Sequence, residues 1–185
     1  MKPSLIVAGL GNPGASYTFT RHNVGFLAVE HLAEKYGEGE WQDKQKFASQ
    51  ILEGRIVTAP ILFVKPQTFM NRSGEAVQKI LDFFKLDPHE QLLVVCDDID
   101  LPLGDVRMRM KGGPGTHNGL KSIVDVIGEE FPRLRIGIGA QPAGADLANW
   151  VLSAPSKEEA DTLHAAIEAL PEQLETFVLG EEPPR

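Results

Sequence analysis

Short apolar runs alternate with segments of helical periodicity along this chain, and the alternation limits the folds open to it. The apolar runs at 4–10, 61–65 and 92–96 have the length of buried strands. Between them, residues 24–36 and 71–84 carry apolar side chains at the spacing of amphipathic helices. Strands that alternate with helices predict an α/β fold, a three-layer sandwich with helices flanking a mixed, partly parallel sheet.

The rest of the chain continues this pattern. We expect further strands at 47–53, 106–110 and 134–138, a helix at 118–127 and an acidic helix at about 156–179. No internal repeat, low-complexity tract or linker interrupts the sequence. Residues 1–185 are therefore expected to form one domain.

Composition indicates where such a protein works. No apolar run reaches the length of about 18 residues that a transmembrane helix needs. The first residues resemble a strand more than a signal peptide. The single cysteine, Cys96, cannot form an internal disulfide, which suits a reducing compartment. We expect a cytoplasmic protein without membrane association.

The net charge of −8 argues at first against a nucleic-acid partner. However, residues 156–182 hold eight acidic side chains and one lysine, and so carry −7 of that charge. Residues 107–121 carry four basic side chains and no acidic one. A basic face is possible on an acidic protein because association responds to local potential. On charge alone, a solvated charged loop explains the segment better than a binding face does.

The stretch from Gly9 to Gly14 matches the G-x-G-x-x-G pattern of dinucleotide-binding loops. Pro13 interrupts it, helical periodicity begins only near Val24, and no acidic residue ends a second strand at the required distance. We interpret the glycines as a tight turn, and we expect no cofactor.

His22 follows a loop at the head of a helix, where an imidazole can be partly exposed and can accept a proton near neutral pH. Asp97 ends a buried strand and can orient that imidazole, as the carboxylate of a catalytic triad does. The alternatives are a histidine bonded to a neighbour and an aspartate that caps its strand. We expect no metal, because neither a second acidic cluster nor histidines and cysteines at zinc-ligand spacing are evident.

No side chain has the sequence context of a protein nucleophile. Cys96 closes an apolar run and is expected to be buried and inert, and no serine occupies a G-x-S-x-G turn. Water activated by His22 is therefore the expected nucleophile. Asn12, Asn71 and Asn118 occupy turns or helix starts, where their amides can bind an ester or a developing oxyanion, or can simply cap a helix.

Six stretches together resemble the bacterial-type peptidyl-tRNA hydrolase family, in family order and up to about residue 155. They are 9–14, Tyr17 with 20–23, 65–71 with 73–74, 97–102, 117–121 and 133–139. The resemblance implies one α/β domain, normally monomeric, that hydrolyses the ester bond between peptide and tRNA. It would rescue tRNA from peptides that the ribosome has dropped.

The resemblance also implies roles for single residues. His22 matches the catalytic base, Asp97 the carboxylate that keeps it basic, and Asn12 the position linked to preference for N-blocked esters. The positions that contact the tRNA end or the peptide are matched by Tyr17, Phe69, Asn71 and Asn118. Arg109 and Arg135 match basic positions near the 5′-phosphate of the acceptor stem.

The sequence differs from the family pattern at two places, and two alternative functions stay open. Pro114 and Thr116 stand where family members often have small or glycine residues, which predicts a stiffer loop. The basic tail of some members has no counterpart, which predicts weaker affinity for the tRNA body. One rival is a non-catalytic RNA-binding relative on the same fold, and the other is a hydrolase of a different ester or amide.

Overall fold

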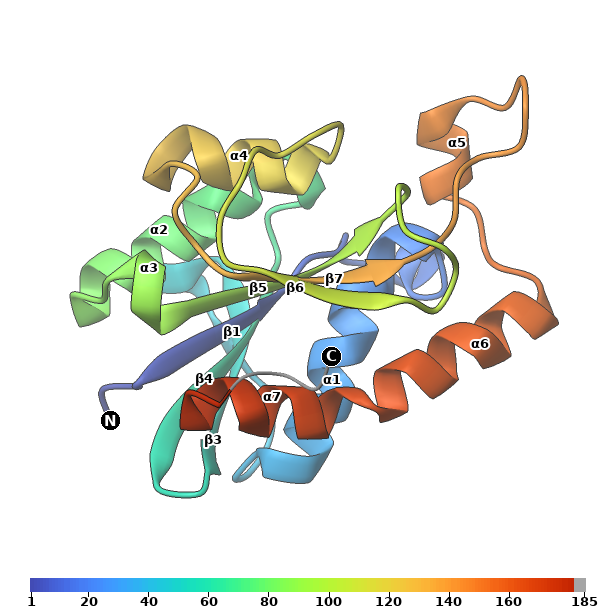
Figure 1. Ribbon diagram of the computed structural model, residues 1–185. Helices are drawn as coiled ribbons and strands as arrows, with labels where there is room; N and C mark the ends of the chain where they lie inside the picture. Colours follow the sequence, from blue (N-terminus) through green and yellow to red (C-terminus); the bar gives the residue numbers. More distant parts are fainter. Residues whose placement is uncertain (182–185) are drawn as a thin grey trace.

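A mixed seven-stranded sheet divides the chain into three layers in the computed structural model, which describes residues 1–181 (Figure 1). The strands are β1 (Leu5–Gly9), β2 (Gln42–Lys44), β3 (Ser49–Ile56), β4 (Ala59–Pro66), β5 (Leu92–Asp98), β6 (Val106–Arg109) and β7 (Arg133–Gly137). Their order in the sheet is β2-β3-β4-β1-β5-β7-β6. The central pairs β4–β1, β1–β5 and β5–β7 are parallel, and the outer pairs are antiparallel. The predicted α/β sandwich is confirmed.

Helices cover both faces of the sheet. One layer consists of α1 (Val24–Tyr36), α6 (Lys157–Glu168) and α7 (Leu170–Leu179), and the other of α2 (Ser73–Phe84), α3 (Pro88–Gln91) and α4 (Asn118–Ile127). The short α5 (Leu147–Val151) stands apart from both layers in Figure 1. Four single 3-10 turns are η1 (Ala15–Tyr17), η2 (Arg21–Asn23), η3 (Gln45–Phe47) and η4 (Met70–Arg72).

The core has two halves because side chains alternate between the faces of each strand. In β1, Leu5 and Val7 pack into the cluster that contains α1, α6 and α7. Ile6 and Ala8 pack into the cluster that contains α2 and α4. A central strand covered on both faces must be apolar at every position, which explains why residues 4–10 read as one continuous apolar run.

The expected acidic helix at 156–179 is wrong as a single element. It is two helices, α6 and α7, with Ala169 as the last cap of one and the first cap of the other. Pro171 stands in the first turn of α7, where its missing N–H costs nothing, whereas within a continuous helix it would break a hydrogen bond. Residues 182–185, which the expected domain included, lie outside the described part of the chain.

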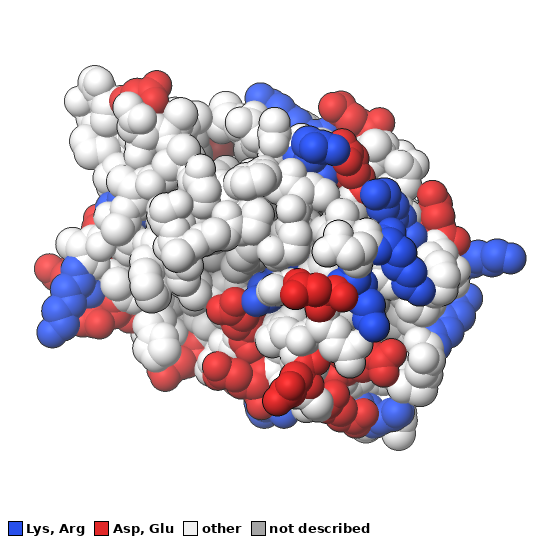
Figure 2. Space-filling view, turned by 180° about the vertical axis from the view of Figure 1, so that it is seen from behind, with Lys and Arg blue, Asp and Glu red and all other residues white. Residues whose placement is uncertain are grey.

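Charge is distributed unevenly over the surface. Figure 2 shows a face with a broad uncharged area, acidic side chains along its lower part and basic side chains on its right. Within residues 1–181, no helix is both long and apolar enough to cross a membrane.

Candidate active site

The carboxyl ends of the three central parallel strands β4, β1 and β5 lie at the same edge of the sheet, and most of the predicted site residues follow them. Asn12 lies in the loop after β1. After β4, Phe69 directly precedes the turn η4 and Asn71 lies within it. Asp97 is the last residue but one of β5. In parallel sheets this edge is where ligands bind. The loops that carry these side chains therefore follow neighbouring strands at one edge of the sheet.

His22 is held at this edge by its neighbours in the chain. Asn23 binds the loop after β1 twice, because its Oδ1 accepts the N–H of Asn12 at 2.8 Å and its Nδ2 donates to the carbonyl of Asn12 at 2.9 Å. Gly25 lets α1 approach the strands, since a Cβ atom there would lie 2.5 Å from the carbonyl oxygen of Val95. The turn η2 is thus fixed against the ends of β1 and β5.

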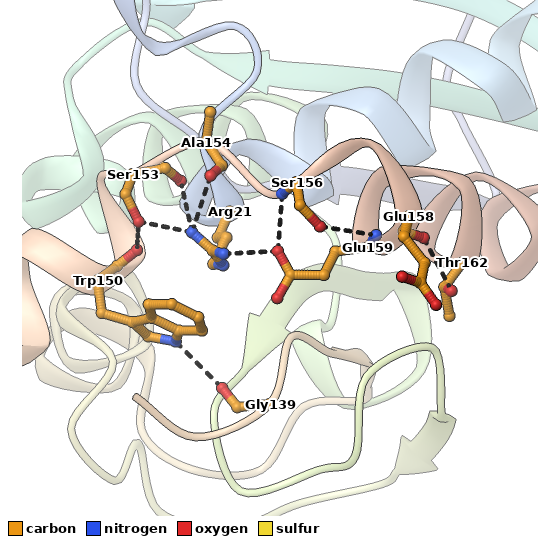
Figure 3. A network of polar contacts seen from close by, with 9 residues as sticks. All are labelled: Arg21, Gly139, Trp150, Ser153, Ala154, Ser156, Glu158, Glu159 and Thr162. Atoms are coloured by element: carbon orange, nitrogen blue, oxygen red, sulfur yellow. Dashed lines mark hydrogen bonds and ion pairs between the residues drawn. The ribbon is translucent and has the colours of Figure 1, made fainter. Parts of the chain in front are cut away.

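Arg21 anchors the other side of η2 (Figure 3). Its guanidinium, which is buried, donates to the carbonyl oxygens of Ser153 and Ala154 and to Glu159 Oε2. The same group lies 3.6 Å from the ring centroid of Trp150, a cation–π distance. These contacts connect the turn that carries His22 to the connection between α5 and α6.

His22 and Asp97 are in direct contact. Nδ1 of His22 lies 2.9 Å from both Oδ1 and Oδ2 of Asp97, which is 2% exposed. Because an ionised carboxylate can only accept, Nδ1 carries the proton and Nε2 keeps its lone pair. Nε2 has no hydrogen-bond partner within residues 1–181, and His22 lines a cleft of about 500 Å³. This arrangement presents a base to the cleft.

A second imidazole contacts the same carboxylate. Nε2 of His117 lies 2.9 Å from Oδ1 of Asp97, and the rings of His22 and His117 are 4.8 Å apart. Burial opposes ionisation of Asp97, but the contacts with His117 and His22 outweigh it and lower the pKa of this carboxyl below its ordinary value. Asp97 is therefore the negative centre of the site.

His22, Asp97 and His117 are also the one group within residues 1–181 with three metal-ligand atoms in close proximity. Two observations favour a hydrogen-bonded unit. The nitrogens of His22 and His117 lie at hydrogen-bond distance from Asp97, and Nδ1 of His117 accepts the backbone N–H of Leu120, which leaves the proton on Nε2, the nitrogen that faces Asp97.

The three arginines at the cleft differ in their exposure and in their hydrogen-bond partners. Arg135, largely buried, donates to Asp98 Oδ2 at 2.8 Å, and its Nε has no partner within the described chain. Arg109 is exposed at the cleft. Arg133, which has no predicted role, is buried and donates to the carbonyls of Gly113, Glu129 and Phe131. Arg109 is thus better exposed to a ligand than Arg135.

The cleft does not contain every predicted residue. His22, Asp97, Asn118, Arg109 and Arg135 line it. Asn12 lines a separate pocket of about 250 Å³. Three further residues, Tyr17, Phe69 and Asn71, line neither space, and the rings of Tyr17 and Phe69 meet edge to face at 6.4 Å.

Two of these residues have constrained geometry. Oδ1 of Asn12 accepts the N–H of Met70 at 2.8 Å, which joins the loop after β1 to η4 and fixes the orientation of the amide. Phe69 has φ 63° and is 51% exposed. A bulky residue with positive φ is strained, so the surrounding loop holds this ring outward against an energetic cost.

Sequence reasoning missed Arg21, Asn23 and His117 as site residues. Arg21 and Asn23 flank His22, and their adjacency was the available signal. His117 precedes a helix, where histidine is an uncommon cap, but its contact with Asp97 depends on how α4 packs and is not visible in the sequence. Cys96 is buried as expected, and burial raises the pKa of its thiol, which leaves it inert.

Comparisons with known proteins show the family to which the chain belongs. Residues 6–183 match the family described as peptidyl-tRNA hydrolase. The peptidyl-tRNA hydrolase of Chloroflexus aggregans is 46% identical over 174 residues, covering 94% of this chain and 92% of the relative. That of Carboxydothermus hydrogenoformans is 47% identical over 170 residues, covering 91% and 89%. The crystal structure of peptidyl-tRNA hydrolase from Acinetobacter baumannii superposes with a TM-score of 0.91 at 37% identity, covering 97% of this chain and 91% of that one.

Proposed function

Because the chain belongs to the peptidyl-tRNA hydrolase family, we propose that His22 is the general base of an enzyme that hydrolyses peptidyl-tRNA. The hydrolytic activity follows from the family. The assignment of His22 is carried by one observation, the contact between its Nδ1 and the buried carboxylate of Asp97, which leaves Nε2 free toward the cleft.

The reaction needs only water and this pair. Nε2 of His22 takes a proton from a water molecule as its oxygen attacks the carbonyl carbon of the ester. Asp97 stabilises the imidazolium that forms. When the tetrahedral intermediate collapses, the ribose oxygen leaves and takes the proton back from His22. The products are a peptide with a free carboxyl group and a tRNA with a free 3′ end.

Asn12 is proposed to act on the ester. Its Oδ1 is occupied by the N–H of Met70, and its Nδ2 has no partner within residues 1–181. An oriented amide N–H can stabilise a developing oxyanion or bind the blocked amide of a peptide. A free aminoacyl ester lacks that blocked amide, so Asn12 supports a preference for N-blocked substrates.

The remaining predicted residues are proposed to hold the substrate. Tyr17 and Phe69 offer aromatic surface on which bases of a 3′ end can stack. Asn71 and Asn118 are exposed amides at helix starts and can bind the peptide or the terminal ribose. Arg109 and Arg135 are proposed to face the acceptor stem and its 5′-phosphate.

We further propose that the enzyme acts as a monomer in the cytoplasm, where its substrate is produced. The rival of a non-catalytic RNA-binding relative finds no support in the site. A protein that no longer catalyses hydrolysis has no need to keep the buried Asp97 in contact with a histidine that lines the cleft, and this contact is intact.

Substitution of His22 by alanine tests the proposal. His22→Ala should lower the rate of hydrolysis of N-acetyl-aminoacyl-tRNA by about 10² to 10⁴, because positioned bases contribute rate factors of that order. The matched control is His31→Ala, since His31 lies in the adjacent α1 and its one ion pair within residues 1–181 is with Glu34. A folded His22→Ala protein with nearly the activity of the control would remove His22 from this role.

A further inference from the structure

The two ring nitrogens of His117 have different partners, and this difference assigns its protonation state. His117 is the N-cap of α4, and its Nδ1 accepts the backbone N–H of Leu120 at 3.2 Å. A nitrogen that accepts carries no proton. The proton of a neutral His117 is therefore on Nε2, the atom 2.9 Å from Asp97. In this state both nitrogens are satisfied.

Protonation of His117 at Nδ1 would remove the side-chain cap at the first turn of α4. A proton on Nδ1 would face the N–H of Leu120, donor against donor, and the helix would lose its side-chain cap. The positive end of the helix dipole also disfavours an imidazolium at this place. Moreover, the ring of His22 is only 4.8 Å away, so two imidazolium ions would repel each other.

We propose that His117 is a positioning residue that stays neutral during the reaction, donates its Nε2 proton to Asp97 and so moderates how strongly Asp97 stabilises protonated His22. The inference rests on the proposed role of His22. A hydrogen bond to a carboxylate favours its charged form and disperses that charge. Asp97 thereby divides its charge between two donors, and His22 releases its proton to the leaving group more readily.

The packing around His117 fits a fixed ring. Gly119 lies directly behind it, and a Cβ atom there would lie 3.0 Å from Cε1 of His117 and 2.5 Å from Sδ of Met70. A side chain at this position would therefore press on both the ring of His117 and the side chain of Met70. Asn118, the proposed substrate contact, is the next residue in the chain after His117.

Other charges near the pair have partners or are exposed. Asp98 and Arg135 bind each other, and Arg133 binds backbone carbonyls. The further charged groups that line the cleft are Asp100, Arg109, Lys121 and Asp146, all exposed. Exposed charges are screened by solvent and salt. Among the groups around Asp97 and His22, the direct contact of His117 therefore has the largest effect on how strongly Asp97 stabilises protonated His22.

Two substitutions separate the two hydrogen bonds of His117. His117→Asn keeps an oxygen near the position of Nδ1, which can cap α4, but removes the donor to Asp97. His117→Gln keeps an amide N–H near the position of Nε2 but removes the cap. We expect the acidic limb of the kcat/KM profile to move to higher pH in His117→Asn, by on the order of half a pH unit. In His117→Gln the limb should stay near that of the parent, while the melting temperature falls.

The measurement is the pH dependence of kcat/KM for N-acetyl-aminoacyl-tRNA in the parent and both variants. The proposal would be overturned if the acidic limb of this profile is unchanged in folded His117→Asn, or if it moves equally in both variants. A variant-free check is the ¹⁵N chemical shifts of the imidazoles in the parent. His117 should keep a protonated Nε2 and a bare Nδ1 throughout the pH range in which the enzyme is active, whereas a proton on both nitrogens of His117 in that range would contradict the proposal. The spectra do not depend on catalysis, so this failure is distinct from a failure of the role of His22.

Discussion

At the scale of single residues, the site depends on one buried negative charge. The contacts of Asp97 with two imidazoles keep its pKa below that of an aspartate in an unfolded chain. A carboxyl group with this shift stabilises the fold above about pH 4, where the unfolded chain is also ionised. The stabilisation is lost as pH falls from that value toward the folded pKa, because the unfolded chain takes up the proton first.

Asp97→Asn should therefore weaken the acid sensitivity of the fold. The free energy of unfolding, measured with urea between pH 5 and pH 3, should fall less steeply with pH in the variant than in the parent. Glu53→Gln is the control, since Glu53 is exposed and its one ion pair is with the N-terminus. Parallel slopes for Asp97→Asn and the parent would mean that this charge contributes nothing specific to folding.

Asn12→Asp should change substrate selection more than stability. An aspartate keeps the oxygen that accepts the N–H of Met70 at 2.8 Å, so the contact between the loop after β1 and η4 survives. It replaces the N–H of the amide by a negative charge, which repels an oxyanion and attracts a free α-ammonium group. The ratio of kcat/KM for N-acetylated over free aminoacyl-tRNA should fall by about tenfold or more, since a lost hydrogen bond to a charged group costs about 1.5–3 kcal/mol.

The selection ratio and the melting temperature should be measured on the same Asn12→Asp preparation. An unchanged ratio with a lowered melting temperature would assign Asn12 to the turn alone.

At the scale of elements, the turn η2 is attached to the α5–α6 connection through one side chain. Arg21→Lys should destabilise the protein by about 1–3 kcal/mol, because an ammonium group cannot replace the planar set of donors of the buried guanidinium. The carbonyl of Ala154 and the ring of Trp150 would lose their partner (Figure 3). The carbonyl of Ser153 would keep the backbone N–H of residue 21, which lies 3.0 Å away. Urea unfolding measures the effect.

Arg55→Lys is the matched control for this variant, since Arg55 is exposed at the β3–β4 hairpin. Equal stabilities of the two variants would show that Arg21 is not an anchor. Because Arg21 adjoins His22, we also expect a lower kcat in Arg21→Lys.

The elements also show what the sequence can predict. The apolar runs that became β1, β4 and β5 are confirmed because central strands are buried on both faces and carry a strong signal. The three exposed or half-exposed residues of β2 and the five of α5 carry no such periodicity, and neither element was predicted.

In the site, His22 and Asp97 were predicted to meet, since each has a chemical signature beside a strand end or helix start. The meeting of His117 with Asp97 depends on the packing of α4 and could not be predicted.

At the scale of the whole molecule, the sheet separates the acidic helices α6 and α7 from the arginines that line the cleft. In β7, Leu134 and Ile136 pack into the core half that contains α6 and α7. Because side chains alternate along a strand, Arg133 and Arg135 point to the other face, as does Arg109 opposite Arg133 in β6. An acidic protein can thus present arginines to RNA at the cleft, while the acidic helices α6 and α7 lie behind the sheet.

This separation predicts how tRNA binding responds to salt. Arg109→Gln should weaken the binding of uncharged tRNA and flatten the plot of log K against log salt by about one unit, because each phosphate contact releases roughly one counterion. Arg135→Gln should flatten it less, since Arg135 is already paired with Asp98 at 2.8 Å. Lys157→Gln, which removes a positive charge from α6 behind the sheet, is the control and should leave the slope unchanged.

Cleavage of a minimal ester without the tRNA body should be the same in all three variants, since none of these side chains contacts His22 or Asp97. If Arg109→Gln and Lys157→Gln share one slope, the cleft does not bind the phosphates and tRNA lies on another face. If Arg135→Gln has the larger effect, the pair with Asp98 must open on binding, and Arg135 rather than Arg109 is the principal phosphate contact.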